Sequence, residues 1–417
     1  MNTQLRHLWR EIDDRLGDRS MPPLLSVSQT LGVVRRELIS DKPPRADSFD
    51  KYKICDIGDL VLNRFNAYRG SLGISTERGI VSPDYLVLRP TRNSHPKFLE
   101  FMLRSEELSN FMKSTMGGLG ASDPDVSGFS RIDVGSLGQY GVPRLEFQEQ
   151  LAIAEFLDRE ILQIDDLIDK QERLIELLAE KRQAVITQAV TKGLDPSAST
   201  KSSGVPWLGA IPTHWKIGPV RRFYEIVLGK MRQREQETAL DVLRPYLKAA
   251  SVQPDGMVAD DTNKMWFSPA EVSNLSLRPG DVLVVEGGSI GQSVVVDATV
   301  SDYGFEKSLN RVRPQRDACS EYFHLYMVIA RASGYVAMQC SGATLMHLPS
   351  DKLGRMVMPF PPESEQREIV KTVQQRLSAL SGVQDRCRRL IGLLQERRSA
   401  LISAAVTGKI DVREGAV

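Results

Sequence analysis

The sequence predicts an α+β protein in which two mixed α/β domains are joined by two long antiparallel coiled-coil helices. Three observations lead to this prediction: an internal repeat, a heptad pattern within the repeated stretch, and short apolar segments separated by turns elsewhere. The repeat aligns the chain with itself, without a gap, at an offset of 216 residues, so that Gln150 falls on Gln366. A repeat of this length indicates two copies of one structural unit.

The repeated stretch is predicted to be a long helix in each copy. LIELLAEKRQAVITQAVTKGLD (174–195) aligns with LIGLLQERRSALISAAVTGKID (390–411). Seam residues recur at alternating spacings of three and four, which is the pattern of a coiled coil, and about 45 residues would span roughly 65 Å. The apolar seam positions are Ile161, Ile164, Ile168, Ile175 and Leu178 in the first helix and Leu377, Leu380, Ile391 and Leu394 in the second.

An apolar stripe of this length needs a partner, because helix propensity alone does not hold it in water. The other copy of the helix is the simplest partner. Docking on a separate protein is the alternative, and both arrangements can hold on different faces. Arg182 and Arg398 occupy equivalent seam positions where an apolar residue is expected. We expect them to bury their stems and to pair with a nearby Glu such as Glu180 or Glu396; a role facing phosphate is the alternative.

The rest of the chain divides around these helices. Short apolar segments between turns, such as LLSVSQ (24–29) and YLVLRP (85–90), predict strands, and PKFLEFMLRSEELSNFMKS (96–114) predicts a helix. The stretch 193–219 is rich in Ser, Pro and Gly, which indicates a linker. The predicted order is a first domain (1–145), the first long helix (146–195), a linker (196–219), a second domain (220–361), the second long helix (362–410) and a tail (411–417).

The two domains share an outline rather than a sequence. Gly58-Asp59 matches Gly280-Asp281, and the segment VLRP (87–90) matches RVRP (311–314). Outside these anchors the two domains differ strongly. A duplicated frame with diverged loops indicates two recognition modules of one kind that read two different things.

Composition excludes several classes of protein. The 417 residues carry a net charge of +1, which excludes a uniformly basic surface but not local basic loops that bind nucleic acid. The chain has no run of eighteen apolar residues, so we expect a soluble, cytoplasmic protein that does not enter a membrane. Single cysteines make a disulfide framework or a zinc site unexpected, and we expect buried thiols at Cys55, Cys319, Cys340 and Cys387.

The sequence contains no recognisable catalytic constellation. Its five histidines show no metal-ligand spacing, and no lysine follows an acidic residue by two positions, as one type of nuclease site requires. The segment GGSIG (287–291) fits a hairpin turn better than a phosphate-binding loop, because a predicted strand and not a helix follows it. We therefore expect a binding protein that is not an enzyme.

Basic and polar residues that can contact nucleic acid lie in turns. NRFNAYRG (63–70) suits the reading of base edges, because Arg can span guanine O6 and N7 and Asn can span adenine N6 and N7. A solvated hairpin with one buried Tyr is the alternative, and a solvated helix start explains GKMRQREQ (229–236) about as well as DNA contact does. His347 aligns with Arg131, so equivalent loops would read unlike bases. The candidates are Arg35, Arg36, Arg64, Asn66, Tyr68, Arg69, Arg131, Lys230, Arg232, Gln233, Arg234, Lys248, Thr344 and His347.

Three segments resemble the specificity subunit of type I restriction–modification enzymes. They are GDLVLNRFNAYRGSLGI with GIVSPDYLVLRP (58–90), QLAIAEFLDREILQIDDLIDKQERLIELLAEKRQAVITQAVTKGLDP (150–196) and SGVPWLGAIPTHW (203–215). The resemblance covers essentially the whole chain, and the three segments together are highly specific.

The resemblance implies two target-recognition domains, each reading one half of a bipartite site in double-stranded DNA. The long helices would serve as spacer and as docking surface for two modification subunits, which bring S-adenosylmethionine and methylate adenine; restriction subunits that use ATP with Mg can join them. This chain itself would hold no cofactor. Because the domains have diverged, we expect an asymmetric site. A coiled-coil scaffold that binds proteins without DNA specificity is the alternative.

Overall fold

A computed structural model describes residues 2–42, 46, 48–116, 131–253, 256–259, 263–340, 346–410 and 412. Contacts divide the chain into two compact units, Met1–Glu172 with Cys387–Val417, and Arg173–Arg386. Each long helix therefore contributes one part to each unit. The predicted boundaries between domains, helices, linker and tail stay a prediction. Among the described residues, no helix combines the length and apolar character needed to cross a bilayer.

The first unit is built on a four-stranded antiparallel sheet with the order β2-β9-β6-β7. Side chains alternate across it: Leu62 and Leu88 face a core formed with the helices, whereas Val61 and Val87 face the hairpin β3–β4. Both faces are therefore covered, which explains the continuous apolar segments of the sequence. The sheet strands are β2 (Trp9–Glu11), β6 (Leu60–Asn63), β7 (Leu72–Ile74) and β9 (Tyr85–Pro90). Around them lie β1 (Asn2–Gln4), β3 (Leu25–Ser28), β4 (Gly32–Arg35), β5 (Lys53–Cys55), β8 (Gly79–Val81), β10 (Gly141–Pro143), α1 (Pro96–Arg104), α2 (Glu106–Ser114), α3 (Val134–Gln139) and the 3-10 turns η1 (Leu5–His7), η2 (Arg36–Leu38) and η3 (Ala67–Arg69).

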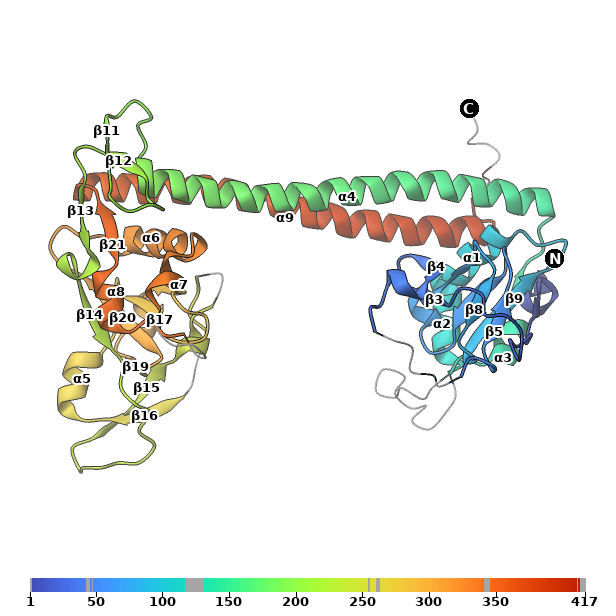
Figure 1. The fold of residues 1–417 in the computed structure, drawn as a ribbon, viewed down its shortest axis with the longest axis horizontal. Helices are drawn as coiled ribbons and strands as arrows, with labels where there is room; N and C mark the ends of the chain where they lie inside the picture. The colour runs from blue at the N-terminus through green and yellow to red at the C-terminus, as the bar shows by residue number, and fades with distance from the viewer. Residues whose placement is uncertain are drawn as a thin grey trace. The chain divides into compact units, whose positions relative to one another are not determined.

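The second unit repeats this sheet as β14-β20-β17-β18. Val282 pairs with Val312 where Leu60 pairs with Leu88 in the first unit. Helix α6 lies between the sheet and the long helices (Figure 1), and the Tyr322 hydroxyl donates at 3.3 Å to the Val190 carbonyl of the long helix α4 (Phe147–Lys192). The repeated elements are β13 (Lys216–Pro219), β14 (Tyr224–Leu228), β17 (Val282–Val285), β18 (Ser293–Val295), β20 (Leu309–Pro314), β21 (Val357–Phe360), α6 (Ser320–Ala332), α7 (Tyr335–Gln339) and α8 (Ser350–Arg355). This unit also has β15 (Val242–Leu247), β16 (Lys264–Phe267), β19 (Gly304–Phe305), α5 (Pro269–Leu275), η4 (Val220–Arg222), η5 (Ala249–Ser251) and η6 (Ala298–Val300).

The segment 196–219, predicted as a linker, is folded within the second unit. It contains the hairpin of β11 (Thr200–Ser202) and β12 (Ala210–Pro212), and its β13 pairs with β21. Trp215 is buried in the core, and its indole N–H donates to Glu365 Oε1 at 3.0 Å. A buried Trp that keeps its polar group paired is what fixes an otherwise polar segment in place.

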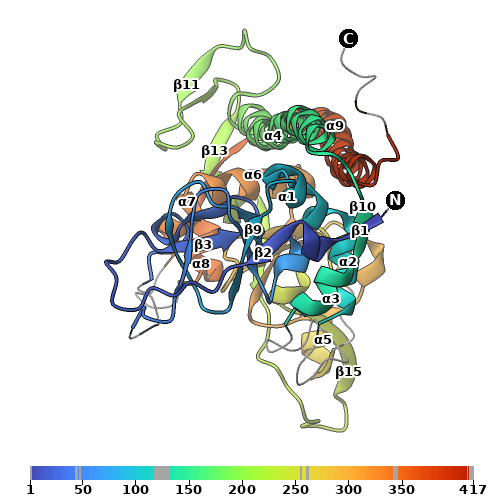
Figure 2. The same ribbon diagram turned by 90° about the vertical axis from the view of Figure 1, so that its right-hand side faces the viewer.

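The long helices are α4 (Phe147–Lys192, 46 residues) and α9 (Glu363–Val406, 44 residues). In each unit a part of α4 runs antiparallel beside a part of α9 (Figures 1 and 2). In the first unit Ile164, Ile168 and Leu394 form a buried cluster. The predicted fold class, with its antiparallel coiled coil, is confirmed. Ile161 is also buried, and the remaining seam positions are half-buried: Ile175, Leu178, Leu377, Leu380 and Ile391.

The two seam arginines have partners other than the glutamates expected from the sequence. Arg398 Nη1 lies 3.1 Å from Asp165 Oδ1 in the first unit. Arg182 Nη1 donates to Ser381 Oγ at 2.5 Å in the second. The expected pairing with Glu180 or Glu396 was wrong: residues two positions apart on a helix do not face each other, and both arginines reach across to the antiparallel helix.

The first turn of each long helix carries a buried glutamine at the same place, Gln150 in α4 and Gln366 in α9. Gln150 Oε1 accepts a hydrogen bond from the backbone N–H of His95 at 2.9 Å, and its Nε2 donates to the carbonyls of Asn93 and Leu145 at 2.9 and 3.0 Å. All polar atoms of a buried amide are thereby satisfied, which fixes the helix to the loop before α1. Gln366 makes the same three bonds in the second unit, to Cys319, Asp317 and Pro361 at 2.9, 3.1 and 2.9 Å.

The sequence anchors shared by the two domains form a second duplicated contact. Arg89 donates to both carboxylate oxygens of Asp59 at 2.7 Å. Arg313 holds Asp281 in the same way, at 2.7 and 2.8 Å. Both aspartates are 1% exposed. A buried carboxylate needs a paired cation, so these two positions cannot diverge independently.

Candidate nucleic-acid interface

The turn Asn63–Gly70 joins β6 to β7 and presents its side chains to two different places. Asn63 Oδ1 accepts from the Phe65 N–H at 3.0 Å, which starts the turn, and Gly70 ends it with a φ of 90°. Glycine adopts this left-handed conformation without strain. Between Asn63 and Gly70 the chain makes the 3-10 turn η3. Arg64 bonds to Ile132, whereas Tyr68 lines a cavity beside α9, so the two side chains lie on separate sides of the turn.

Arg64 and Arg131, distant in the sequence, lie side by side. The Ile132 N–H donates to the Arg64 carbonyl at 3.0 Å, and Arg64 Nη2 donates to the Ile132 carbonyl at 3.3 Å. The Arg131 guanidinium lies 5.3 Å from the centre of the Phe65 ring and pairs with Asp84 at 3.3 Å. Its side chain remains 50% exposed. An arginine stacked on an aromatic ring is held in place while part of its donor edge faces solvent.

A concave surface of about 850 Å³ adjoins this pair in the first unit. Arg36, Lys42 and Lys51 line it, together with Asp84. The Arg36 Nε is buried and has no hydrogen-bond partner among the described residues. The sequence did not indicate Lys42, Lys51 or Asp84, because each is an isolated charge in a separate segment and only the fold brings them together.

Four other candidates of the first domain lie apart from Arg131. Arg35 Nε and Nη2 donate to the two oxygens of Glu77 at 2.9 and 2.8 Å, and hydrogen bonding from Arg35 lowers the pKa of this carboxyl. Tyr68 packs against the core, and the Arg69 guanidinium lies 5.2 Å from the centre of its ring. Both face a cavity beside α9. Asn66 is half-buried at the start of η3.

In the second unit the candidate Lys230 is largely inside the protein. Its ammonium donates to Gln233 Oε1 at 2.7 Å, to the Trp266 carbonyl at 3.0 Å and to Glu271 Oε2 at 2.5 Å. Because the Lys230 ammonium bonds to three acceptors, one of them Gln233, these two side chains fix the loop that follows β14. The candidates left on the surface of this loop are Arg232 and Arg234, both exposed.

His347 takes the place that Arg131 has in the first unit. Leu348 N–H donates to the Glu286 carbonyl at 2.9 Å, just as Ile132 does to Arg64, and His347 itself is exposed and bridges to Gly287. The same backbone frame therefore presents different side chains in the two units. Lys248 is half-buried before η5, and Thr344 lies outside the described residues.

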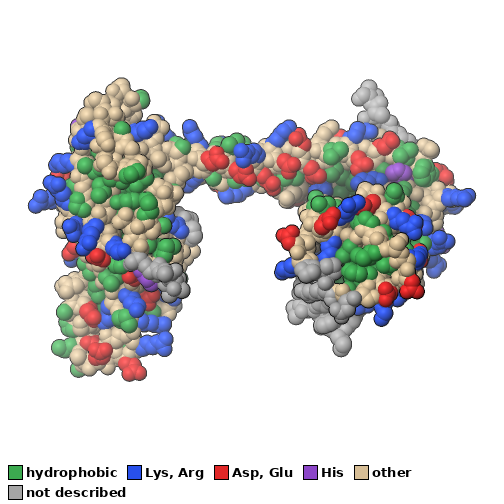
Figure 3. All heavy atoms as spheres, viewed as in Figure 1, with side chains coloured by type: hydrophobic (Ala, Val, Ile, Leu, Met, Phe, Trp, Pro, Cys, Tyr) green, Lys and Arg blue, Asp and Glu red, His purple; other side chains and the backbone are tan. Residues whose placement is uncertain are grey.

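Charged side chains of both signs are mixed on the surface, and the described ranges hold no cluster of metal ligands. On the face drawn in Figure 3, Lys and Arg side chains lie among Asp and Glu side chains in each unit. Across the described ranges no group of three or more His, Cys, Asp or Glu is placed to hold a metal ion. All four cysteines are free; Cys55, Cys319 and Cys387 are buried and Cys340 is half-buried.

Two known proteins are similar in sequence to most of this chain. The chain is 22% identical to the type I restriction enzyme EcoKI specificity subunit of Escherichia coli strain K12 over 333 residues, which cover 78% of this chain and 68% of that one. The MjaVIII specificity subunit of Methanocaldococcus jannaschii is also 22% identical, over 76% of this chain and 70% of its own. No protein-family model matches the chain.

Solved structures agree with these relatives. A chain from a study of complex assembly and conformational transition in the type I R-M system matches with a TM-score of 0.72 at 15% identity, covering 98% of both chains. This chain has the fold of the type I specificity subunits. The HsdS subunit from Thermoanaerobacter tengcongensis has it as well, with a TM-score of 0.58 at 14% identity over 98% of this chain and 97% of that one. The resemblance read from the sequence is confirmed.

Proposed function

We propose that this chain is the DNA-specificity subunit of a type I restriction–modification complex, and that it reads an asymmetric bipartite site. The observation that carries the proposal is a frame that occurs twice in this chain with unlike side chains on its surface. The buried contacts of Gln150 and Asp59 recur at Gln366 and Asp281, whereas the exposed position of Arg131 is taken by His347. Two equal scaffolds with different side chains at the same place read two different half-sites.

The chemistry of the first unit suits contact with DNA. Arg131 can donate to guanine, Asp84 can accept from the amino group of cytosine, and Lys42 and Lys51 supply charge for phosphates. The scaffold alternative is not favoured, because the related proteins are named specificity subunits.

The experiment is a selection of bound duplexes from a random pool, followed by titration of the selected site at several salt concentrations. We expect two unlike short motifs separated by a fixed gap, and an affinity that falls steeply as salt rises. A palindromic motif, or no enriched motif, contradicts the proposal. Arg131→Gln should relax one half of the motif and His347→Ala the other.

We further propose that two modification subunits dock on the long helices and supply methylation with S-adenosylmethionine, and that restriction subunits with ATP and Mg join them. Exposed leucines support a docking surface: Leu174 and Leu177 are 37% and 45% exposed in the second unit, and their repeat equivalents Leu390 and Leu393 are 43% and 61% exposed in the first. Exposed apolar patches on helices are typical of protein interfaces.

The two copies of this patch allow a stoichiometric test. The full chain is expressed together with a modification subunit, and the mass of the complex is measured by light scattering. Leu177→Lys and Leu393→Lys should each remove one partner subunit, and the double variant both. Unchanged mass in the double variant contradicts docking at these leucines.

A further inference from the structure

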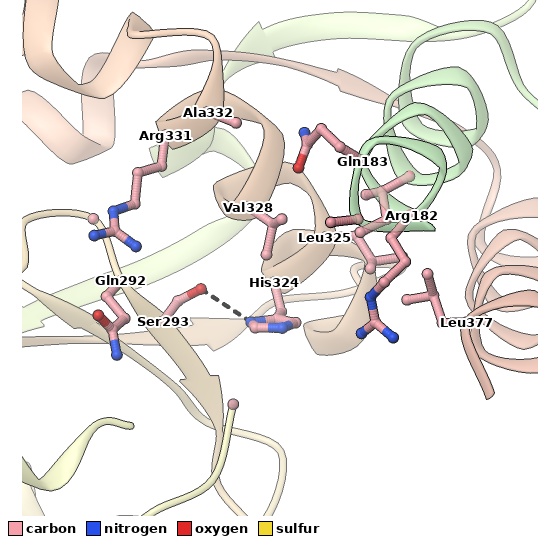
Figure 4. A pocket seen from close by; sticks show the side chains of 14 residues that line it. Arg182, Gln183, Gln292, Ser293, His324, Leu325, Val328, Arg331, Ala332 and Leu377 are labelled. Atoms are coloured by element: carbon pink, nitrogen blue, oxygen red, sulfur yellow. Dashed lines mark hydrogen bonds between the residues drawn. The ribbon is translucent and has the colours of Figure 1, made fainter. Parts of the chain in front are cut away.

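A cavity of about 690 Å³ lies in the second unit between α4, α6 and the turn before β18. Figure 4 shows its polar side chains on opposite sides: Arg331 with Gln292 on one, and Arg182 with Gln183 on the other. His324 lies between them, and its Nδ1 is 3.0 Å from Ser293 Oγ. Among the described residues that line the cavity there is no Asp or Glu. The described lining therefore combines two cations and several hydrogen-bond donors, and the carboxylates of the described residues lie outside it.

The two arginines differ in their attachments. Arg182 donates one hydrogen bond to the neutral hydroxyl of Ser381, at 2.5 Å, and makes no ion pair with a carboxylate of the described residues. The Arg331 side chain is exposed at the mouth of the cavity, and its guanidinium makes no ion pair or hydrogen bond within the described ranges. Burial lowers the pKa of His324. A neutral imidazole adds a hydrogen-bonding group and no charge, so the positive charge of the cavity comes from the arginines.

The first unit contains the equivalent cavity, of about 430 Å³, and there two of the three lining arginines pair with carboxylates. Arg398 and Ile402 line it where Arg182 and Ile186 line the cavity of the second unit. Arg398 pairs with Asp165 at 3.1 Å, and the lining residue Arg104 pairs with Glu100 at 3.1 Å. Through the shared glutamine contacts and helix repeat, Asp165 aligns with Ser381 and Glu100 with His324. The second unit thus has neutral groups at both positions where the first has carboxylates.

We propose that the cavity of the second unit is a binding site for a phosphate group. Guanidinium groups, amides and a hydroxyl that approach from several sides match the oxygens of a phosphate, which accepts on every side, better than a planar carboxylate with two oxygens. An anion there supplies beside Arg182 the negative charge that Asp165 supplies beside Arg398 in the first unit. The phosphate can belong to a nucleic-acid backbone or to a free phosphorylated molecule.

The test uses the full-length chain and inorganic phosphate as the probe. Phosphate is titrated by calorimetry at constant ionic strength, with chloride as the comparison anion. We expect saturable binding of phosphate that chloride does not reproduce. Because a charge-assisted hydrogen bond is lost, Arg331→Gln should weaken binding by about tenfold.

Ser381→Asp is the sharper variant, because it places beside Arg182 the carboxylate that the first unit already carries beside Arg398. It should fold, as melting temperature and circular dichroism can verify, and it should abolish phosphate binding. Arg355→Gln on α8 is the matched control: it removes one exposed arginine, 3.8 Å from Asp351, and should leave binding unchanged.

The outcomes are separable. No saturable binding, or equal binding in Ser381→Asp and in the control, overturns the proposal. If an added duplex displaces bound phosphate, the natural ligand is a backbone phosphate; if binding persists beside the duplex, it is a free phosphorylated molecule. None of these readings depends on sequence-specific recognition of DNA, so the site can fail while the proposed function holds, and the reverse.

Discussion

Arg398 lies 3.1 Å from Asp165 in the first unit, whereas its repeat equivalent Arg182 donates to the hydroxyl of Ser381 in the second. The duplication has thus kept the position of the arginine and changed the charge of its partner. The two contacts are expected to differ in their dependence on salt, because only the first is an ion pair.

Loss of the Arg398 ion pair should cost little stability. Both side chains are about half exposed, at 43% and 41%, and exposed pairs contribute about 0.2–1 kcal/mol. Arg398→Leu and Asp165→Asn, measured singly and together by urea unfolding, should show a coupling energy below about 1 kcal/mol that shrinks in high salt. A salt-independent coupling above about 2 kcal/mol would show that the pair is effectively buried.

Loss of Gln150 should cost much more. Gln150→Leu removes the partners of three backbone groups, those of His95, Asn93 and Leu145, in a buried site. Each buried group left unsatisfied costs about 1–3 kcal/mol, so we expect about 3 kcal/mol or more in total. Gln366→Leu should have a similar effect on the second unit. The exposed Gln374 of α9 provides the control, since Gln374→Leu should change the unfolding free energy by less than about 0.5 kcal/mol.

The sequence predicted those parts of the fold that periodicity controls. The seam from Ile161 to Ile168 and from Ile391 to Leu394 follows directly from heptad spacing, and the repeat offset led to the equivalence of Arg131 and His347. The segment 196–219 was read as a linker from its Ser, Pro and Gly content, whereas Trp215 and Ile211 anchor it in the core. Composition averages over a segment and misses two well-placed apolar residues.

The candidate interface was less predictable than the fold. Arg64 and Arg131 come together because residue 132 pairs with residue 64 through the backbone, and this long-range pairing has no local signal. Lys230 looked available because it stands among charged residues, but Glu271 and the Trp266 carbonyl, far away in sequence, accept hydrogen bonds from its ammonium. A single sequence gives the charge of a side chain and not its partners.

Stability should fall as the pH drops below about 6.5, the ordinary pKa of histidine. Burial lowers the pKa of His95 in the first unit and of His324 in the second. The unfolded chain then binds protons at a higher pH than the folded chain does, so acid favours unfolding. His324→Gln should reduce the loss of unfolding free energy between about pH 7.5 and about pH 5.5. A variant with an unchanged or larger loss over this range contradicts the assignment to His324.

Arg131 and Lys51 should affect DNA binding in different ways. Arg131 is held over Phe65 beside Asp84, so it is placed for a base edge, and Arg131→Gln should cost about 1–3 kcal/mol on the selected site and relax one position of it. Lys51 lines the adjoining concave surface, where Lys51→Ala should weaken all duplexes alike and lower the slope of log affinity against log salt by about one.

Both are measured by fluorescence anisotropy with selected and scrambled duplexes. Arg159→Gln, an exposed change on α4, is the control. If Arg131→Gln weakens selected and scrambled duplexes equally, Arg131 contacts phosphate and the base-reading residues of the first unit lie elsewhere.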